Sequence, residues 1–374
     1  MTGTAFLISC SDHYHHRMHL WDKCLGGKGY QTRYITSNFD HTTKQTFVCS
    51  IPECVQIPVR PYRKNLSADR ILSHKLFAKS VLAYLEQHKP NVIVALLPPN
   101  FLAHYLAKYK KAHPDTVLIF DIFDLWPETF PSNKAKKLLS GAFRVWAGLR
   151  DRNLWAADHI TTECDLFRET LSLREDRSTT LPLCAQPITL SCQPQLSDDR
   201  LELCYLGAIN NVIGIEEISS LLRQVCAQRP VTLHIIGKGE RQQEFMDKAT
   251  AAGAEVVFHG AVYEEAEKLT IMDRCHFGLN VMRSSVCVGL TMKSVDYFRF
   301  GLPIINNIPA DTSRLVSQYD AGIPMDDRCA QTLVSISNQR CLEMRKHVQT
   351  LFARHFSQSI VEETLDNLLN QING

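Results

Sequence analysis

Short apolar segments alternate with helical patterns through the first half of this chain, and this alternation limits the possible folds more than any other feature. The segment 91–97, Asn-Val-Ile-Val-Ala-Leu-Leu, is apolar after its first residue and predicts a strand buried on both faces. Such strands belong to parallel sheets that helices cover on both sides. The strands expected in this half are 5–10, 31–36, 91–97 and 117–120, and the helices are 15–26, 73–87 and 101–113.

The same alternation starts again near Leu201. The segment 178–200 contains three prolines among Ser, Thr and Gln, which is the composition of a linker. A length of 374 residues also favours two domains. We therefore expect an α/β protein with domains at 1–190 and 200–357 and a closing helix within 358–374 that packs on the first domain. The strands expected after the linker are 202–206, 231–236, 255–259, 276–281 and 303–306.

Charge and cysteine content exclude several classes of protein. A net charge of +2 argues against a nucleic-acid binder, which would be strongly basic on one face. The 13 cysteines include no Cys-x-x-Cys pair, so we expect reduced thiols in a cytosolic protein rather than disulfides or a zinc site. The N-terminal apolar run 5–10 is too short for a signal peptide. No apolar run approaches the ~18 residues of a membrane span.

The segment 289–303 predicts a loop, a short helix and a turn into a buried strand. Thr291 can cap this helix, whose free N–H groups and positive dipole end suit a phosphate. A cation in the first turn, such as Lys293, is unfavourable there unless an anion binds. Asp296 follows three residues later on the same face and can accept hydrogen bonds from sugar hydroxyls. The alternative interpretation is an ordinary solvated Lys/Asp pair on a surface helix.

The first three strands of the second half each run directly into a glycine, at 207, 237 and 260. Glycine lets a ligand approach the backbone closely. The second of these glycines begins Gly237-Lys238-Gly239, which resembles part of the dinucleotide-binding fingerprint. The third glycine of that fingerprint is replaced by Gln242, which argues against a Rossmann dehydrogenase.

Two strand ends in the first half carry polar residues, and ligands gather at the carboxyl ends of parallel strands. Asp12 and His13 follow the first strand, within a run that contains three histidines. That run fits a metal site or, more commonly, loop surface, and we expect no metal. Asp121 and Asp124 follow the strand at 117–120 and can face a ligand, or cap a helix before Pro127.

Six motifs occur in the order and spacing of one enzyme family. They are 124–128 Asp-Leu-Trp-Pro-Glu, 156–161 Ala-Ala-Asp-His-Ile-Thr, 206–207 Leu-Gly, 235–240 Ile-Ile-Gly-Lys-Gly-Glu, 257–262 Val-Phe-His-Gly-Ala-Val and 296–303. With them the chain resembles the large family of retaining GT-B glycosyltransferases that use nucleotide sugars, particularly those that build bacterial polysaccharides. The resemblance implies two Rossmann-like domains whose parallel sheets face each other across a cleft.

The resemblance also implies a donor site. It places Asp296 on the ribose and the segment 289–291 around the diphosphate and donor sugar. The substrate would be a nucleotide sugar, with UDP-sugar preferred, and no cofactor or metal is implied. The residues expected to bind the donor are Gly207, Asn210, Lys238, Ala261, Val262, Tyr263, Gly289, Leu290, Thr291, Met292, Lys293 and Asp296.

This chain departs from the family pattern at two positions. Val288 stands where the family carries the first of two glutamates, and Ala208 stands where it tends to carry arginine. These departures make Lys293 and Lys238 more important for the diphosphate, because each ammonium suits phosphate.

The expected function is sugar transfer from a nucleotide sugar to a lipid-linked or oligosaccharide acceptor. For assistance in deprotonating the acceptor, Asp124 is the first candidate, Asp121 and Asp12 come second, and His13 is third. A second hypothesis is a non-catalytic GT-B subunit that stabilises a partner transferase, and a third is an epimerase of nucleotide sugars.

The segment 134–152 contains six basic residues and one acidic residue, interleaved with apolar side chains that include Trp146. A basic amphipathic helix with an exposed Trp is typical of membrane-surface elements. The alternative is a packed helix with a solvated charged face. We expect a cytoplasmic protein with membrane contact through this segment.

Overall fold

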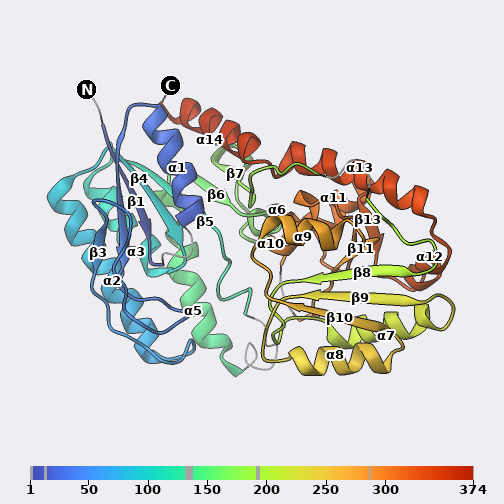
Figure 1. Ribbon diagram of the computed structural model, residues 1–374. Helices are drawn as coiled ribbons and strands as arrows, with labels where there is room; N and C mark the ends of the chain where they lie inside the picture. Colours follow the sequence, from blue (N-terminus) through green and yellow to red (C-terminus); the bar gives the residue numbers. More distant parts are fainter. Residues whose placement is uncertain (1–2, 12–14, 131–137, 191–193, 286–287, 374) are drawn as a thin grey trace. The chain divides into compact units, whose positions relative to one another are not determined.

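The computed structural model describes residues 3–11, 15–130, 138–190, 194–285 and 288–373, which form two compact units. Unit 1 comprises Met1–Leu181 and Glu362–Gly374, and unit 2 comprises Pro182–Val361 (Figure 1). The last helix, α14 (Gln358–Asn373), therefore begins in unit 2, and most of it belongs to unit 1.

Unit 1 is built on a seven-stranded parallel sheet with the strand order β3-β2-β1-β4-β5-β6-β7. The side chains of β4 are at most 2% exposed, as its uninterrupted apolar sequence predicts. The strands are β1 (Thr4–Ser9), β2 (Gln31–Ser37), β3 (Val55–Ile57), β4 (Val92–Leu97), β5 (Val117–Ile122), β6 (His159–Thr162) and β7 (Ser178–Thr180).

Helices of unit 1 cover this sheet. Helix α2 packs on α3 and α3 on α5, whereas α1 contacts β1 and β2. Lys23 and Lys28 on α1 bond to Glu362 and Asn370 of α14, which attaches the end of the chain to unit 1. The helices are α1 (His15–Gly27), α2 (Ala68–His88), α3 (Phe101–Ala112), α5 (Ser140–Asp151) and α6 (Asp165–Thr170).

Unit 2 contains a six-stranded parallel sheet with the order β10-β9-β8-β11-β12-β13. Its strands are β8 (Leu201–Leu206), β9 (Val231–Ile236), β10 (Glu255–Gly260), β11 (Phe277–Asn280), β12 (Ile304–Asn306) and β13 (Gly322–Pro324). Its helices are α7 (Ile215–Cys226), α8 (Gln242–Ala251), α9 (Glu265–Met272), α10 (Met292–Arg299), α11 (Asp311–Tyr319), α12 (Cys329–Ser335) and α13 (Asn338–His355).

Each sheet reverses its strand order beside its first strand, between β1 and β4 in unit 1 and between β8 and β11 in unit 2. At such switch points the connections leave in opposite directions, so a crevice opens at the carboxyl ends. In unit 2 the hydroxyl of Tyr297 lies at this point, where it accepts from the amide of Leu206 at 2.7 Å and donates to the carbonyl of Cys204 at 3.1 Å.

The strands and helices expected from the sequence are present, with ends that differ by a few residues. The expected linker is partly wrong, because Ser178–Thr180 form β7 and pair with β6. Two threonines favour a strand there, since β-branched side chains pack well on a sheet. The short strands β3, β6 and β13 were not expected. No helix in the described part of the chain is long and apolar enough to cross a membrane.

Candidate active site

The start of helix α10 is fixed by a buried hydrogen-bond network at the carboxyl ends of β11 and β12. Thr291 is the N-cap, and its hydroxyl accepts from the amide of Ser294 at 3.1 Å. The side-chain amide of Asn280 donates to the hydroxyl of Ser294 at 3.0 Å and to Asn306 at 2.7 Å. The predicted cap is confirmed, and the first turn of α10 therefore begins at the edge of the sheet where ligands bind.

Lys293 lies in this first turn, with its ammonium nitrogen 4.0 Å from the centre of the Tyr205 ring. Its Cε is 3.3 Å from where a Cβ on Gly207 would lie, so it packs over the end of β8. No carboxylate of the described residues pairs with it. Burial lowers the pKa of Lys293 to about 7 because no anion compensates the lost hydration. A bound anion would restore the charged form.

Asp296 lies one turn farther along α10 and is partly buried. Burial raises the pKa of its carboxyl, and the cations Lys268 and Arg299 oppose this shift. Within the described residues its side chain accepts no hydrogen bond, so its lone pairs are available to hydroxyl donors. Lys293 and Asp296 thus lie on the same short helix, as the sequence predicts.

Among the glycines that end β8, β9 and β10, Gly237 is needed for backbone packing, a reason that the sequence analysis did not give. Gly207, Gly237 and Gly260 have φ values of +124°, +150° and +70°. A Cβ on Gly237 would lie 2.0 Å from the carbonyl oxygen of Gly207. Gly237 therefore lets the ends of β8 and β9 pack against each other, whereas a Cβ on Gly260 would meet only the Lys238 side chain, at 3.9 Å. The exposed Lys238 is carried on the turn that results.

The other residues expected to bind the donor are spread along the same edge of the sheet in unit 2. Asn210 accepts from the amide of Val212 at 3.0 Å, so its side-chain oxygen already holds a turn. The Gly289 carbonyl accepts from the amide and hydroxyl of Thr312, at 2.9 and 2.7 Å. The side chains of Leu290 and Val262 are buried, Ala261 is partly buried, and Met292 and Tyr263 are exposed.

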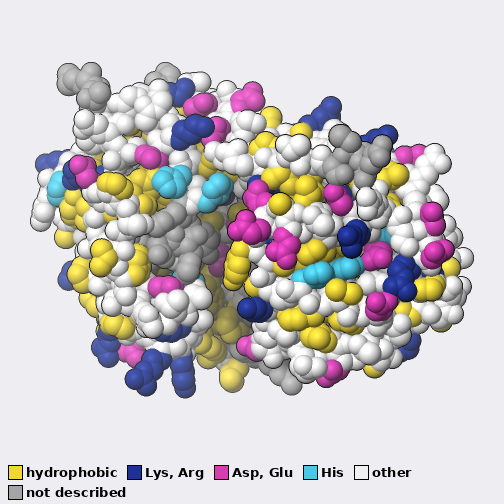
Figure 2. Space-filling view, viewed as in Figure 1, with side chains coloured by type: hydrophobic (Ala, Val, Ile, Leu, Met, Phe, Trp, Pro, Cys, Tyr) yellow, Lys and Arg dark blue, Asp and Glu magenta, His cyan; other side chains and the backbone are white. Residues whose placement is uncertain are grey.

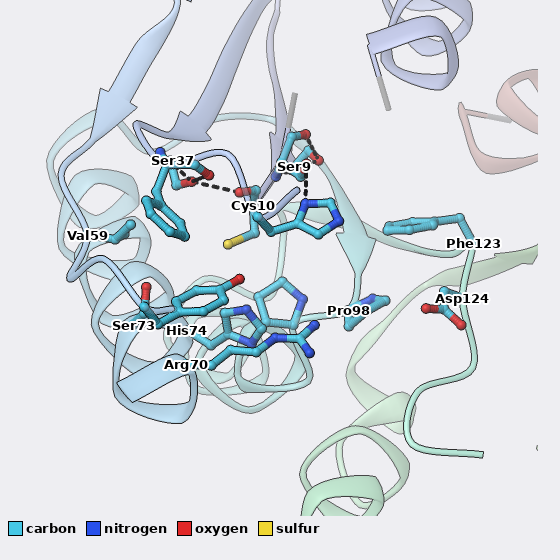
Figure 3. Close-up of a pocket in the computed structure, with 15 residues that line it drawn as sticks. Ser9, Cys10, Ser37, Val59, Arg70, Ser73, His74, Pro98, Phe123 and Asp124 are labelled. Carbon is cyan, nitrogen blue, oxygen red and sulfur yellow. Dashed lines mark hydrogen bonds between the residues drawn. The ribbon is translucent and has the colours of Figure 1, made fainter. Parts of the chain in front are cut away.

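Unit 1 contains a cavity of about 80 Å³ at its own switch point (Figure 3). It is lined from the ends of β1, β2, β4 and β5 and from the start of α2. Asp124 lines it, and the Asp124 carboxylate accepts from the hydroxyl of Thr129 at 2.7 Å. Burial raises the pKa of Asp124, which strengthens this carboxylate as a proton acceptor.

Asp121 is not at this cavity, and this corrects its place among the candidates. It is fully buried, and its carboxylate accepts from Arg17 through two bonds of 2.7 Å, from Trp21 at 2.9 Å and from Thr161 at 2.8 Å. Four hydrogen bonds occupy the acceptor positions of a carboxylate. Asp121 therefore holds α1 against β5 and β6. Asp12 and His13 lie outside the described residues.

Glu163 is a carboxyl group that the sequence analysis missed. It follows β6 directly, and its backbone amide donates to Ile122 of the neighbouring β5 at 3.1 Å. Burial raises the pKa of Glu163 to about 8, and the carboxylates of Asp124 and Asp121 add to this effect, whereas Arg17 opposes it. The sequence analysis predicted no strand at 159–162, so nothing in it singled out the carboxyl group that follows. Within the described residues, no three His, Cys, Asp or Glu side chains form a cluster that could hold a metal.

Comparison with known proteins identifies the fold and the second unit. Residues 200–335 match the family model described as Glycosyl transferases group 1. The chain has a GT-B fold, and the residues that match this family model lie within unit 2. Comparison with curated protein sequences gives no match.

Three solved structures illustrate the shared GT-B fold. Sucrose-phosphate synthase from Thermosynechococcus elongatus aligns with a TM-score of 0.69 at 13% identity, covering 99% of each chain. The lipopolysaccharide outer core galactosyltransferase WaaB gives 0.68 at 12% identity, covering 98% of this chain and 99% of WaaB. HepE from Anabaena, in complex with UDP and glucose, gives 0.63 at 12% identity, covering 99% of this chain and all of HepE (100%).

We predict that Glu163→Gln stabilises the protein at high pH. The unfolded chain loses the Glu163 proton near the ordinary pKa of 4.5, whereas the folded chain holds it until about pH 8. Stability therefore falls as pH rises through this window, and glutamine removes that fall. The expected gain at pH 9 is on the order of 1 to 2 kcal/mol after discounting for partial exposure. Urea unfolding at pH 5, 7 and 9 measures it.

The matched control is Glu169→Gln, which changes an exposed glutamate on α6. It should leave the pH dependence of unfolding as in the wild type. A Glu163→Gln protein that follows the wild type at every pH would contradict the buried, protonated state.

Proposed function

We propose that the protein is a metal-independent retaining glycosyltransferase that moves a sugar from a UDP-sugar to a saccharide acceptor in cell-surface polysaccharide synthesis. The observation that carries the proposal is the capped start of α10, which presents Lys293 and Asp296 together inside the group 1 domain. The similar proteins agree with this donor and product class, since HepE is described with UDP and glucose and WaaB as a lipopolysaccharide galactosyltransferase.

The donor diphosphate binds at the start of α10 in this proposal. The free N–H groups of the first turn point toward it, and the Lys293 ammonium neutralises the charge that develops as the glycosidic bond breaks. The Asp296 carboxylate accepts hydrogen bonds from the ribose hydroxyls. The backbone around Ala261–Tyr263, at the end of β10, reads the base.

Transfer joins the acceptor oxygen to the anomeric carbon while the bond from that carbon to the diphosphate oxygen breaks. The diphosphate leaves with the electron pair. The acceptor hydroxyl gives its proton to the Asp124 carboxylate, whose raised pKa suits this role.

We predict that one nucleotide raises the melting temperature of the wild type and that Asp296→Ala loses this shift. A ligand at 100 times its dissociation constant adds about 2.7 kcal/mol of stability. The measurement is a thermal-shift screen of UDP, GDP, ADP and CMP, with UDP as the expected ligand. Asp247→Ala, which removes a carboxylate from α8, should keep the full shift. If no nucleotide stabilises the wild type, catalysis is excluded and a non-catalytic subunit that supports a partner transferase is favoured.

We predict that Asp124→Asn lowers transfer by at least about a hundredfold and leaves nucleotide affinity unchanged, because general bases contribute roughly 10²- to 10⁴-fold. The assay follows radiolabelled sugar from the donor found in the screen into envelope-extracted acceptor. The control Asp115→Asn changes an exposed aspartate just before β5 and should retain activity. Weakened nucleotide binding in Asp124→Asn would contradict the assignment of Asp124 as the proton acceptor.

The proposed acceptor is lipid-linked, and the proposed membrane contact lies on the surface formed by α5 and the start of α2. Val145 is 70% exposed and Leu138 is 85% exposed. An apolar groove of about 460 Å³ lies beside Val145, and Leu66 and Ile71 line its other wall. Figure 2 shows Lys and Arg side chains gathered along the lower edge of unit 1, below α2 in Figure 1. Apolar and basic groups side by side fit an anionic membrane surface.

Two details of the expected membrane helix are corrected. Trp146 is not exposed, because it stacks on Trp126 with ring centres 6.0 Å apart and lines the groove. Arg150 is buried in ion pairs of 2.8 Å with Glu128 and Asp151. Residues 134–137 lie outside the described residues. The membrane-facing groups are therefore Val145, Leu138 and the exposed Arg144.

We predict that the wild type floats with vesicles of phosphatidylglycerol but not of phosphatidylcholine, and that Val145→Asp binds them about tenfold more weakly. The substitution removes an apolar side chain and adds a charge that the anionic surface repels. Val48→Asp is the control, since Val48 is 88% exposed in unit 1 and does not line the groove. If the wild-type protein stays at the bottom of the flotation gradient with phosphatidylglycerol vesicles, the proposed membrane contact is wrong.

A further inference from the structure

Arg70 is a partly buried cation that lines the unit 1 cavity. Its Nη1 donates to the carbonyl of Asn65 at 2.9 Å, and its Nε is buried without a hydrogen-bond partner. No carboxylate of the described residues forms an ion pair with it. Its guanidinium carbon lies 5.4 Å from the centre of the Trp126 ring, which holds the group in place.

The position of Arg70 in the fold makes this arrangement unfavourable without a ligand. Arg70 lies in the first turn of α2, where the helix dipole opposes a cation. The neighbouring carboxylate of Asp69 pairs with Arg60 at 3.0 Å instead. An anion in the cavity would compensate both the buried Nε and the dipole.

His74 supplies an independent observation one turn farther along α2. It lines the same cavity, is 6% exposed, and its Nδ1 is buried without a hydrogen-bond partner. Burial, aided by the Arg70 charge, lowers the pKa of His74 well below its ordinary value, so its ring is neutral. A buried polar nitrogen without a partner costs free energy that a ligand in contact with it would recover.

The rest of the lining offers neutral donors. Burial raises the pKa values of Tyr62 and Cys10 to about 12, so both stay protonated. Ser11 pairs with the Nδ1 of His41 at 3.2 Å. The single acidic side chain in the described lining is Asp124, which Figure 3 shows on the far side of Pro98 from Arg70.

We propose that this cavity binds an anionic group of the acceptor, a carboxylate or a phosphate, through Arg70 and His74. The volume of about 80 Å³ is several times the roughly 10–15 Å³ that one water needs, so a carboxylate or phosphate fits. The inference rests on the proposed function: the acceptor places its charged group at Arg70 and its reactive hydroxyl toward Asp124. The acceptor is therefore a uronic acid or a phosphorylated saccharide.

The test compares three probes that differ only at C6: methyl glucoside, methyl glucuronide and methyl glucoside 6-phosphate. Saturation-transfer NMR on the full chain without nucleotide measures their dissociation constants. An anionic probe should bind on the order of 10- to 100-fold more tightly than the neutral one, the range expected for a charge-assisted hydrogen bond. A preference for glucuronide identifies a uronic acid acceptor, and a preference for the phosphate identifies a phosphorylated one.

The variants assign this preference to the cavity. Arg70→Met should bind all three probes equally, and Lys79→Met, which removes an exposed cation from the same helix, should keep the preference. Arg70→Lys retains the charge but loses the bidentate hydrogen bonds of the guanidinium, so it should keep a weaker preference for the anionic probes. This variant provides the test if Arg70→Met does not fold. Equal binding of the three probes by the wild type, or a preference unchanged in both Arg70 variants, overturns the inference.

The proposed function and this inference fail separately. Nucleotide binding through Asp296 without any anion preference overturns the anionic acceptor alone. An anion preference that depends on Arg70, in a protein that binds no nucleotide, leaves an anion site in unit 1 and contradicts the transferase.

Discussion

The buried side-chain amide of Asn280 determines where the first turn of α10, the proposed binding site of the sugar donor, can form. It is fully buried and bonds to Ser294 of α10 and Asn306 of β12. An unsatisfied amide in a core costs several kcal/mol, so β11, β12 and the first turn of α10 must meet in one arrangement. Thr291 then has to cap the helix, and the helix register places Lys293 and Asp296. Asp121 has the same role in unit 1, where it joins α1, β5 and β6.

The sequence predicts the features that depend on local order. An apolar run such as Val92–Leu97 determines its own burial, and the Thr291 cap needs only three residues to be recognised. It does not separate Asp121 from Asp124, because both follow one strand. The structure separates them through register: Asp121 still pairs with Thr161 of β6, whereas Asp124 lies beyond the end of β5.

The cavity of unit 1 illustrates what sequence reasoning cannot assemble. Arg70 and His74 come from α2, Tyr62 from the loop before it, and Asp124 from the loop after β5. Only the parallel topology brings these segments to one switch point. The glycine after β9 is a different case. The sequence shows that a glycine ends this strand, but it does not show that the backbone of another strand end lies against it. Gly237 contacts the backbone of Gly207, a contact between strand ends that lie far apart in sequence.

Each unit has, at the switch point of its sheet, a cationic side chain that pairs with no carboxylate in the described part of the chain. Lys293 rests on the Tyr205 ring in unit 2, and Arg70 near the Trp126 ring in unit 1. Both side chains are partly buried, and a partly buried charge without a counterion is destabilising, so fold stability alone would favour an apolar side chain at either position. An aromatic ring recovers only part of the lost hydration. Two such cations, each in the first turn of a helix that opposes it, make sense in a protein whose two substrates both carry negative charge. The diphosphate of the donor would satisfy Lys293, and an acidic acceptor would satisfy Arg70.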